Sequence, residues 1–419
     1  MSRFLIEGGV PLRGEIAVAA NKNAVLPMMA ACLLTDADCY LENVPAIADV
    51  STMIAILREL GATVEPVDRN RLRLNCSGVA SYHPSESLVE RLRASIVLMG
   101  PLLARCGRAN MHHPGGDAIG TRSIRTHIQA LRALGAEFDA CDDLYCGRVS
   151  TPARARTIFL DEASVTATEN AMLFAAAQPV TTIIRNAASE PHVANLACFL
   201  SRMGAEITGA GSNIIQIRGR HGLGGATGDV WPDHVEAGTF AALAAATNGE
   251  VRIRNVVAEH LDMVLLILER MGVDFLLDDG TMEIRPASLL AVSKIHTGLW
   301  PAFPTDLASI FIVLATQAEG MTLIHDWMYE GRMFFIDRLV QMGANIVLAD
   351  PHRAVVSGPS ALRGREFVSP DIRAGIALVM AALIASGPST IDHIELIDRG
   401  YERIDERLRG LGARIVRQD

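Results

Sequence analysis

A glycine-rich segment, HHPGGDAIGTRSIRTH at residues 112–127, presents an acid and two arginines within nine residues: Asp117, Arg122 and Arg125. Two adjacent glycines precede the acid and a third follows it. Glycine accepts positive φ angles and adds no side-chain bulk, so the segment is predicted to bend sharply and to move. Two interpretations stay open at this point. The segment either brings an acid and cations to a functional site, or forms a surface turn in which Asp117 caps its own backbone.

The composition indicates a protein of two or three domains. The chain has 419 residues, of which 50% are hydrophobic but only 5% aromatic, so small aliphatic side chains must build the cores. Gly, Pro and Ser break the longest uncharged stretches before they reach the roughly 20 apolar residues of a membrane span. The start lacks the apolar core of a secretion signal. We therefore expect a cytoplasmic protein without membrane insertion.

Charge and cysteine content exclude several kinds of partner. The formal net charge of −9 argues against nucleic-acid binding, because neutralising phosphates requires a basic face. Seven cysteines lie within residues 32–198, and no second pair or histidine cluster completes a zinc site around Cys141 and Cys146. We expect reduced thiols and no metal. Only two of the 38 basic residues are lysines, Lys22 and Lys294, which draws attention to both.

A pattern of apolar helix, Leu-Gly or Met-Gly, and short strand occurs six times. The copies read ILRELGATVE, ALRALGAEFD, FLSRMGAEIT, ILERMGVDFL, RLVQMGANIV and RLRGLGARIV. In each copy the apolar residues recur at three- and four-residue intervals on one helical face. The glycine then falls where the end of a helix favours a left-handed residue. The six glycines are Gly61, Gly135, Gly204, Gly272, Gly343 and Gly412.

A second set of segments alternates with the first, each an Ala-rich helix followed by a turn and a strand. FAALAAATNGEVRIRNV, at residues 240–256, is one example. Because these helices are apolar nearly all round, we expect them inside, covered by sheets. Six such units are too few and too long for an open solenoid, so two globular α/β domains of three units each are favoured.

Several motifs carry a resemblance to a known family: NKNAVLP, PGGDAIGTR, SVTATEN, PDHVEAGTF, FPTDL, DIRAGIALV and IDRGYERIDERLRGLGA. On these residues the chain resembles the enolpyruvyltransferases over essentially its whole length. The resemblance implies two inside-out α/β barrel domains with three βαβαββ-type repeats each, six in total, and an active site in the cleft between them. It implies a first domain at residues 22–231, with a mobile catalytic loop near 112–127, and a second domain at 1–21 plus 232–419.

The resemblance implies a cofactor-free transfer of enolpyruvate from phosphoenolpyruvate to a hydroxyl group, through a tetrahedral ketal that releases phosphate. Holding the phosphate and carboxylate of phosphoenolpyruvate requires converging cations, preferably arginines. The family's catalytic clamp corresponds to Lys22, Arg122 and Arg399. Taken singly, an arginine in this chain is more often a solvated surface residue or a helix-end charge than a ligand. Further arginines that line the family's cleft correspond to Arg93, Arg332 and Arg373.

The resemblance also assigns acids that transfer protons. Asp117 corresponds to a loop position where the family commonly has a proton-donating cysteine, the target of fosfomycin, and where some members carry aspartate. We therefore expect a fosfomycin-insensitive enzyme. Asp306 corresponds to the base near the acceptor hydroxyl, although Asp306 or Thr305 could instead cap the following helix. Other positions assigned to substrate binding are Asn23, Ser164, Val165, Glu190, Asp233, Met328 and Asp371.

The acceptor side departs from the family pattern. After Arg122 the family usually has a Pro-x-Asp-x-His run that helps to grip a uracil ring, and here Ser123 and Arg125 replace the proline and the acid. Ser189 and His234 each replace an arginine. The reaction type is thus better supported than the identity of the acceptor.

Three hypotheses result. The first is transfer of enolpyruvate to the 3-hydroxyl of UDP-N-acetylglucosamine, the first committed step of peptidoglycan synthesis, by a monomer or weak oligomer. The second keeps the chemistry but uses another nucleotide acceptor, such as UMP, in specialised metabolism. The third is a catalytically silent paralogue that binds a nucleotide sugar. The joint presence of the predicted catalytic residues counts against the third: Lys22, Asp117, Arg122, Asp306 and Arg399.

Overall fold

The computed structural model describes residues 2–117, 119–141, 144–151 and 154–418, so residue 118 of the expected loop lies outside the described residues. By its contacts the chain divides into two units. We call Ala20–Gly116 with Arg122–Trp231 the N-terminal unit, and Met1–Ala19 with Asp117–Thr121 and Pro232–Asp419 the C-terminal unit. In the part of the chain that is described, no helix is both long and apolar enough to cross a membrane.

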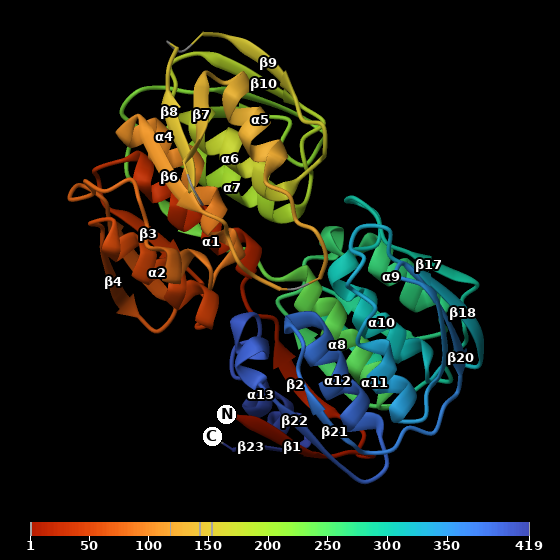
Figure 1. The fold of residues 1–419 in the computed structure, drawn as a ribbon. Coiled ribbons are helices and arrows are strands. Elements are labelled where there is room, and N and C mark those ends of the chain that lie inside the picture. Colours follow the sequence, from red (N-terminus) through yellow and green to blue (C-terminus); the bar gives the residue numbers. More distant parts are fainter. Residues whose placement is uncertain (1, 118, 142–143, 152–153, 419) are drawn as a thin grey trace. The chain divides into compact units, whose positions relative to one another are not determined.

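The N-terminal unit packs three sheets around buried helices (Figure 1). Its inner helices are α1 (Lys22–Ala31), α4 (Met99–Cys106) and α6 (Val165–Ala176), and its outer helices are α2 (Ala48–Glu59), α5 (Arg125–Ala133) and α7 (Pro191–Arg202). Short helical turns are η1 (Cys32–Leu34), α3 (Glu86–Val89) and η2 (Arg93–Leu98). The sheets are β13–β3–β5–β4, β11–β12–β10–β9 and β6–β8–β7. Their strands are β3 (Cys39–Glu42), β4 (Thr63–Asp68), β5 (Arg71–Asn75), β6 (Arg108–His112), β7 (Ala136–Cys141), β8 (Leu144–Val149), β9 (Arg156–Phe159), β10 (Thr181–Arg185), β11 (Glu206–Thr208), β12 (Ile214–Arg218) and β13 (Thr227–Asp229).

The C-terminal unit repeats this plan. Its inner helices are α8 (His234–Ala246), α10 (Ala308–Ala315) and α12 (Ile372–Ile384), and its outer helices are α9 (Asp262–Arg270), α11 (Ile336–Gln341) and α13 (Ile404–Gly410). Short turns are η3 (Ala258–His260), η4 (Thr305–Leu307) and η5 (Ile394–Arg399). The sheets are β21–β22–β1–β23, β15–β16–β14–β2 and β17–β18–β20–β19. Their strands are β1 (Arg3–Glu7), β2 (Arg13–Ala17), β14 (Glu250–Arg254), β15 (Asp274–Asp278), β16 (Thr281–Arg285), β17 (Lys294–His296), β18 (Gly320–His325), β19 (Asn345–Asp350), β20 (Arg353–Gly358), β21 (Glu366–Val368), β22 (Pro388–Asp392) and β23 (Arg414–Gln418).

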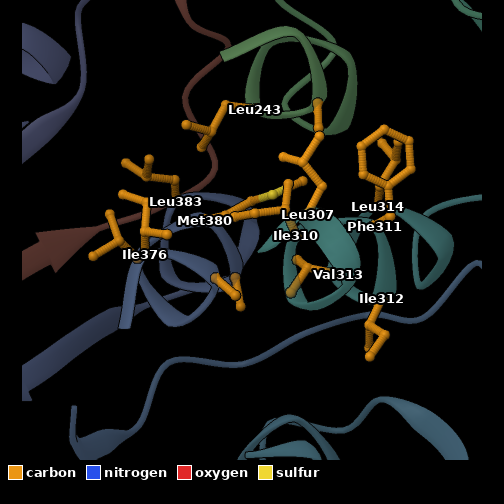
Figure 2. Packing of buried hydrophobic residues seen from close by; sticks show 14 of the residues in the cluster. Leu243, Leu307, Ile310, Phe311, Ile312, Val313, Leu314, Ile376, Met380 and Leu383 are labelled. Carbon is orange, nitrogen blue, oxygen red and sulfur yellow. The ribbon is translucent and has the colours of Figure 1, made fainter. Parts of the chain in front are cut away.

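The inner helices are buried on all sides, as their Ala-rich sequences predict. Every residue of α10 is buried, and so are all residues of α12 except the last. Figure 2 shows Leu243 of α8, Ile310 of α10 and Met380 of α12 packing in one apolar cluster. With apolar helices inside, the sheets must face water on their other side. The expected arrangement of helices inside and sheets outside is thus confirmed.

The six repeat glycines end their helices in the left-handed region, as predicted. Their φ angles range from 73° at Gly272 to 111° at Gly204, a region that residues with a Cβ rarely adopt. Each glycine therefore turns the chain from an outer helix into the next strand.

Strand β1 lies between the last two long strands of the chain. Phe4 stands opposite Ile391 of β22 and Arg417 of β23, both in antiparallel register. Phe4 and Ile6 point inward and are buried. The sheet is therefore completed only when residues from the two ends of the sequence meet.

Candidate active site

Asp117 and Arg399 form an ion pair inside the C-terminal unit. Arg399, the last residue of η5, donates from Nη1 to Asp117 Oδ1 at 2.7 Å, and both side chains are 15% exposed. Among the described residues, this ion pair holds the Asp117 carboxylate, in place of the backbone cap that was the alternative. The pair joins two residues that the resemblance assigns to catalysis, 282 positions apart in the sequence.

The rest of the segment around Asp117 is anchored to the turn before α11. The backbone N–H of Gly331 donates to Ile119 O at 2.8 Å, and that of Thr121 donates to Glu330 Oε1 at 2.8 Å. The hydrogen bond from Thr121 holds the pKa of Glu330 below its usual range. Gly120 has a φ of 135°, a backbone conformation that residues with a Cβ rarely adopt, so this position favours glycine.

Asp306 is the acceptor in a second ion cluster of the C-terminal unit. Arg332 Nη2 donates to Asp306 Oδ1 at 3.0 Å, and Arg373 donates to Oδ2 from Nε at 3.0 Å and from Nη2 at 2.7 Å. The arginine side chains are 3% and 8% exposed, and that of Asp306 is 28% exposed. Two fixed guanidinium groups thus orient a carboxylate that solvent still reaches. The side chain binds these arginines from within η4 and does not cap α10.

Residues that the sequence analysis missed support this cluster. Asp326, fully buried, accepts hydrogen bonds from Thr297, Thr305 and the Met328 backbone, and lies 3.9 Å from Arg332 Nε. The sequence feature that could have identified Asp326 is its position as a lone acid directly after the apolar strand MTLIH.

Tyr401 supports Arg373 in the same way. Its hydroxyl accepts from Arg373 Nη1 at 3.2 Å and lies 3.1 Å from Thr239 Oγ1. Burial disfavours the charged form of Arg373, but Asp306, Tyr401 and Asp233 together outweigh it and hold the pKa of the guanidinium above its ordinary value.

Asp371 and Asp233 cap inner helices. Asp371 accepts from the backbone N–H groups of Arg373 and Ala374 at the start of α12, and Asp233 caps α8 in the same way. Burial raises the pKa of both carboxyl groups despite these hydrogen bonds. For Asp371, the charge of Arg332 lowers the pKa and that of Asp117 raises it, so Asp371 belongs to the same electrostatic cluster.

In the N-terminal unit, Lys22 pairs with Asp49. Asn21 caps α1 by accepting from the Asn23 backbone, which makes Lys22 the first residue of the helix. Its Nζ lies 2.6 Å from Asp49 Oδ2, with side chains 14% and 3% exposed. Asp49, in the first turn of α2, was not predicted, although an acid in a buried helical position was visible in PAIADV.

The Arg93 side chain binds the backbone at both ends of the glycine-rich turn, at Pro114 and at Arg122. Arg93 donates from Nη1 to Pro114 O at 3.2 Å and from Nη2 to the Arg122 carbonyl, which fixes both ends of the turn in this unit. Gly116, with φ of 114°, has no room for a Cβ, because the Arg93 side chain fills that space. The two predicted cations thus share one local structure.

The SVTATEN motif begins helix α6. Ser164 caps the helix, and Val165 is its first residue. Glu169 is 1% exposed, and burial together with the charge of Glu190 raises its pKa well above the ordinary value. Glu190 itself precedes α7. A carboxyl pair thus lies where the resemblance places only Glu190.

The residues that depart from the family pattern have partners of their own. Arg125 Nη2 donates to Asp161 Oδ2 at 2.9 Å, and the arginine side chain is 81% exposed. His234 packs edge-on against Trp300, and burial lowers its pKa to about 3. His127 is also buried, with a pKa lowered to about 3, so both histidines are neutral.

Across the described ranges, no three or more histidine, cysteine, aspartate or glutamate side chains are arranged to bind one metal ion together. The predicted site residues therefore fall into two sets, one in each unit. Arg332, Arg373 and Arg399 with their acids belong to the C-terminal unit, and Lys22, Arg93, Arg122 and Glu190 to the N-terminal unit.

Comparisons with known proteins agree on one family. A family model described as EPSP synthase (3-phosphoshikimate 1-carboxyvinyltransferase) matches residues 6–408. Two curated relatives are named UDP-N-acetylglucosamine 1-carboxyvinyltransferase. The one from Bradyrhizobium diazoefficiens is 47% identical over 99% of this chain and 98% of its own. The one from Treponema denticola is 44% identical over 99% of both chains.

Solved structures show the same fold. The enolpyruvyl transferase NikO from Streptomyces tendae aligns with a TM-score of 0.89 at 23% identity, covering 100% of this chain and 99% of its own. EPSP synthase from Acinetobacter baumannii aligns with a TM-score of 0.77 at 18% identity over 100% of both chains. The expected two-domain α/β enolpyruvyltransferase fold is therefore confirmed. By its family match and its full-length relatives, the chain belongs to the EPSP synthase family of enolpyruvyl transferases.

Proposed function

We propose that this protein transfers enolpyruvate from phosphoenolpyruvate to the 3-hydroxyl of UDP-N-acetylglucosamine and releases phosphate. The names of relatives 40–47% identical over nearly the whole chain support the acceptor. The observation that carries the chemistry is Asp306, a solvent-accessible carboxylate held in one orientation by two buried guanidinium groups.

In this proposal Asp306 takes the proton of the acceptor hydroxyl, whose oxygen bonds to C2 of phosphoenolpyruvate. Asp117 donates a proton to the C3 methylene, which gives the tetrahedral ketal. The ketal then loses phosphate from C2 and returns a proton from C3 to the Asp117 carboxylate, which restores the double bond. One acid and one base suffice for these three proton transfers.

Lys22, Arg122 and Arg399 are the proposed clamp on the phosphate and carboxylate of phosphoenolpyruvate. Arg399 already binds one anion, the carboxylate of Asp117. An arriving phosphate competes for that guanidinium and frees the Asp117 carboxylate, which must take a proton from solvent before it can donate one to C3. The ion pair thereby couples phosphoenolpyruvate binding to the availability of the acid.

A second acceptor, a nucleotide such as UMP, remains the alternative because of one observation. Where the family's loop has an acid, Arg125 binds Asp161 at the start of α5, and Thr126 Oγ1 donates to the same carboxylate at 2.8 Å. A cation stands where the uracil grip is expected.

The test is phosphate release from phosphoenolpyruvate by the purified full chain, with UDP-N-acetylglucosamine and UMP offered in parallel. Turnover with the sugar nucleotide alone supports the proposal. Turnover with UMP alone supports the alternative acceptor instead. No turnover with either, at a protein concentration that detects one event per minute, contradicts both and leaves the nucleotide-sugar-binding paralogue.

A further inference from the structure

Each unit contains a strand that ends on a histidine beside a second histidine. In the N-terminal unit, β6 ends on His112, whose Nε2 lies 3.2 Å from His83 Nε2. The segment with His83 is tied to β6 by a hydrogen bond from Asn110 N to Tyr82 O at 3.0 Å. In the C-terminal unit, β18 ends on His325, whose Nδ1 lies 3.1 Å from His296 Nδ1 on the parallel strand β17. None of these four residues belongs to the proposed reaction.

The spacing of the nitrogens suits two ligands of one metal ion. Imidazole nitrogens bind Zn²⁺ at about 2.0–2.1 Å, so two of them on one ion lie about 2.9 Å apart at a right angle and about 3.4 Å apart at the tetrahedral angle. The separation of 3.2 Å between His83 and His112 falls between these limits. To bind one ion, both rings must turn so that the lone pairs of the two Nε2 atoms point at the ion instead of along the line between them.

A carboxylate distinguishes the first pair from the second. Glu86 Oε1 lies 3.7 Å from His112 Nδ1, a buried nitrogen without a hydrogen-bond partner. Metal-binding histidines usually donate their other ring N–H to a carboxylate, which presents the free lone pair to the ion. Glu86 is placed to do this for His112, and its charge also attracts a cation.

The second pair has the opposite surroundings. Burial lowers the pKa of His325 most, followed by the charge of His296. The positive charges of Lys294 and Arg353 lower it further. These positive charges repel a metal cation. The described residues thus include two pairs of similar nitrogen spacing, with the Glu86 carboxylate near the first and two cations near the second.

We propose that His83 and His112 form a binding site for one divalent transition-metal ion such as Zn²⁺, with Glu86 as the positioning residue. Imidazole suits zinc, copper and nickel, and water completes the coordination. Both rings bind as neutral imidazoles. The hydrogen now shared between the two Nε2 atoms moves to the far nitrogen of its ring, so no electron is transferred and no oxidant is needed.

The site lies at the base of the glycine-rich segment. Two residues after His112, Pro114 accepts the hydrogen bond from Arg93. An ion that joins His112 to His83 would therefore fix the chain where this segment leaves β6. Its chemistry does not depend on the enolpyruvyl transfer proposed above.

The experiment is a titration of the metal-free full chain with Co²⁺, followed by visible absorption, and with Zn²⁺, followed by calorimetry. We expect one ion per chain with the weak absorption of nitrogen and oxygen ligands. His83→Asn should reduce the affinity at least tenfold, and Glu86→Gln should reduce it about 10–100-fold, more than Glu86→Asp. His296→Asn is the matched control and should bind as the wild type does.

Several results overturn the proposal. These are no binding by the wild type, equal losses in His83→Asn and His296→Asn, or an intense thiolate-to-cobalt absorption that assigns the ion to cysteines. His83 is exposed, so its variant remains informative if His112→Asn fails to fold. None of these results depends on whether the protein turns over phosphoenolpyruvate.

Discussion

Replacement of Asp306 separates the two roles that the structure gives this carboxylate. Asp306→Ala leaves two buried guanidinium groups, Arg332 and Arg373, without their shared counter-charge. Breaking a buried pair costs about 3–5 kcal/mol. Asp306 is 28% exposed, and Asp326 remains 3.9 Å from Arg332, so we expect a loss near the lower end, about 3 kcal/mol in the free energy of unfolding.

Asp306→Asn keeps the shape of the side chain but cannot act as the base. Loss of a positioned general base lowers a rate by about 10²–10⁴-fold, which corresponds to about 2.7–5.4 kcal/mol in the activation barrier. We expect this loss in kcat for phosphate release at saturating phosphoenolpyruvate and UDP-N-acetylglucosamine. The loss should exceed anything explained by partial unfolding at the assay temperature.

Urea unfolding of both variants, with Asp350→Ala as a control, measures the change in the free energy of unfolding. Asp350 pairs with Arg353 at the surface, where ion pairs contribute little to stability. Two results would refute the reasoning. If Asp306→Asn keeps kcat within fivefold of the wild type, Asp306 is not the base. If Asp306→Ala is no less stable than Asp350→Ala, the buried ion cluster does not stabilise the unit.

Three further predictions test other parts of the structure. The wild type should resist alkylation by fosfomycin, because a carboxylate is a weaker nucleophile than a thiolate, whereas Asp117→Cys should form a covalent adduct visible by mass spectrometry. Gly115→Ala would place its Cβ against the Glu90 carbonyl and should lower the free energy of unfolding by about 1–3 kcal/mol, while Gly410→Ala, which meets nothing nearby, should be neutral or stabilising. His127 has a pKa of about 3 when folded, because of its burial, against about 6.5 when unfolded. Between these values only the unfolded chain takes up that proton, so stability should fall as the pH drops from 7 to 4, and His127→Gln should show a shallower fall; equal slopes would contradict the assignment.

The fold was largely predictable because its signals are local. The six helix-ending glycines and the Ala-rich inner helices each express a short-range rule, left-handed turns in one case and all-round apolarity in the other. The position of β1 is different. Its partners, β22 and β23, lie about 400 residues away, and no periodicity in RFLIE specifies which edge it joins.

The site was predictable as a set of residue types and motifs, but not as a set of contacts. Lys22 was identified, whereas its partner Asp49 was not, because the pair depends on how α1 and α2 pack. Asp326 was missed for the same reason, since its hydrogen bonds come from segments 21 and 29 residues upstream. Sequence patterns show which groups are present, and tertiary packing decides which of them neutralise one another.

The central position of β1 has a consequence for synthesis in the cell. Ribosomes add about 5–20 residues each second, so the strand that starts at Arg3 waits roughly 20–80 s before β23 is made. Until β22 and β23 have been made, the two edges of β1 have no strand to pair with. The N-terminal unit, whose residues fall within 20–231, can complete its own sheets much earlier. Strand β1 is therefore made long before its partner strands and is among the last strands to be paired.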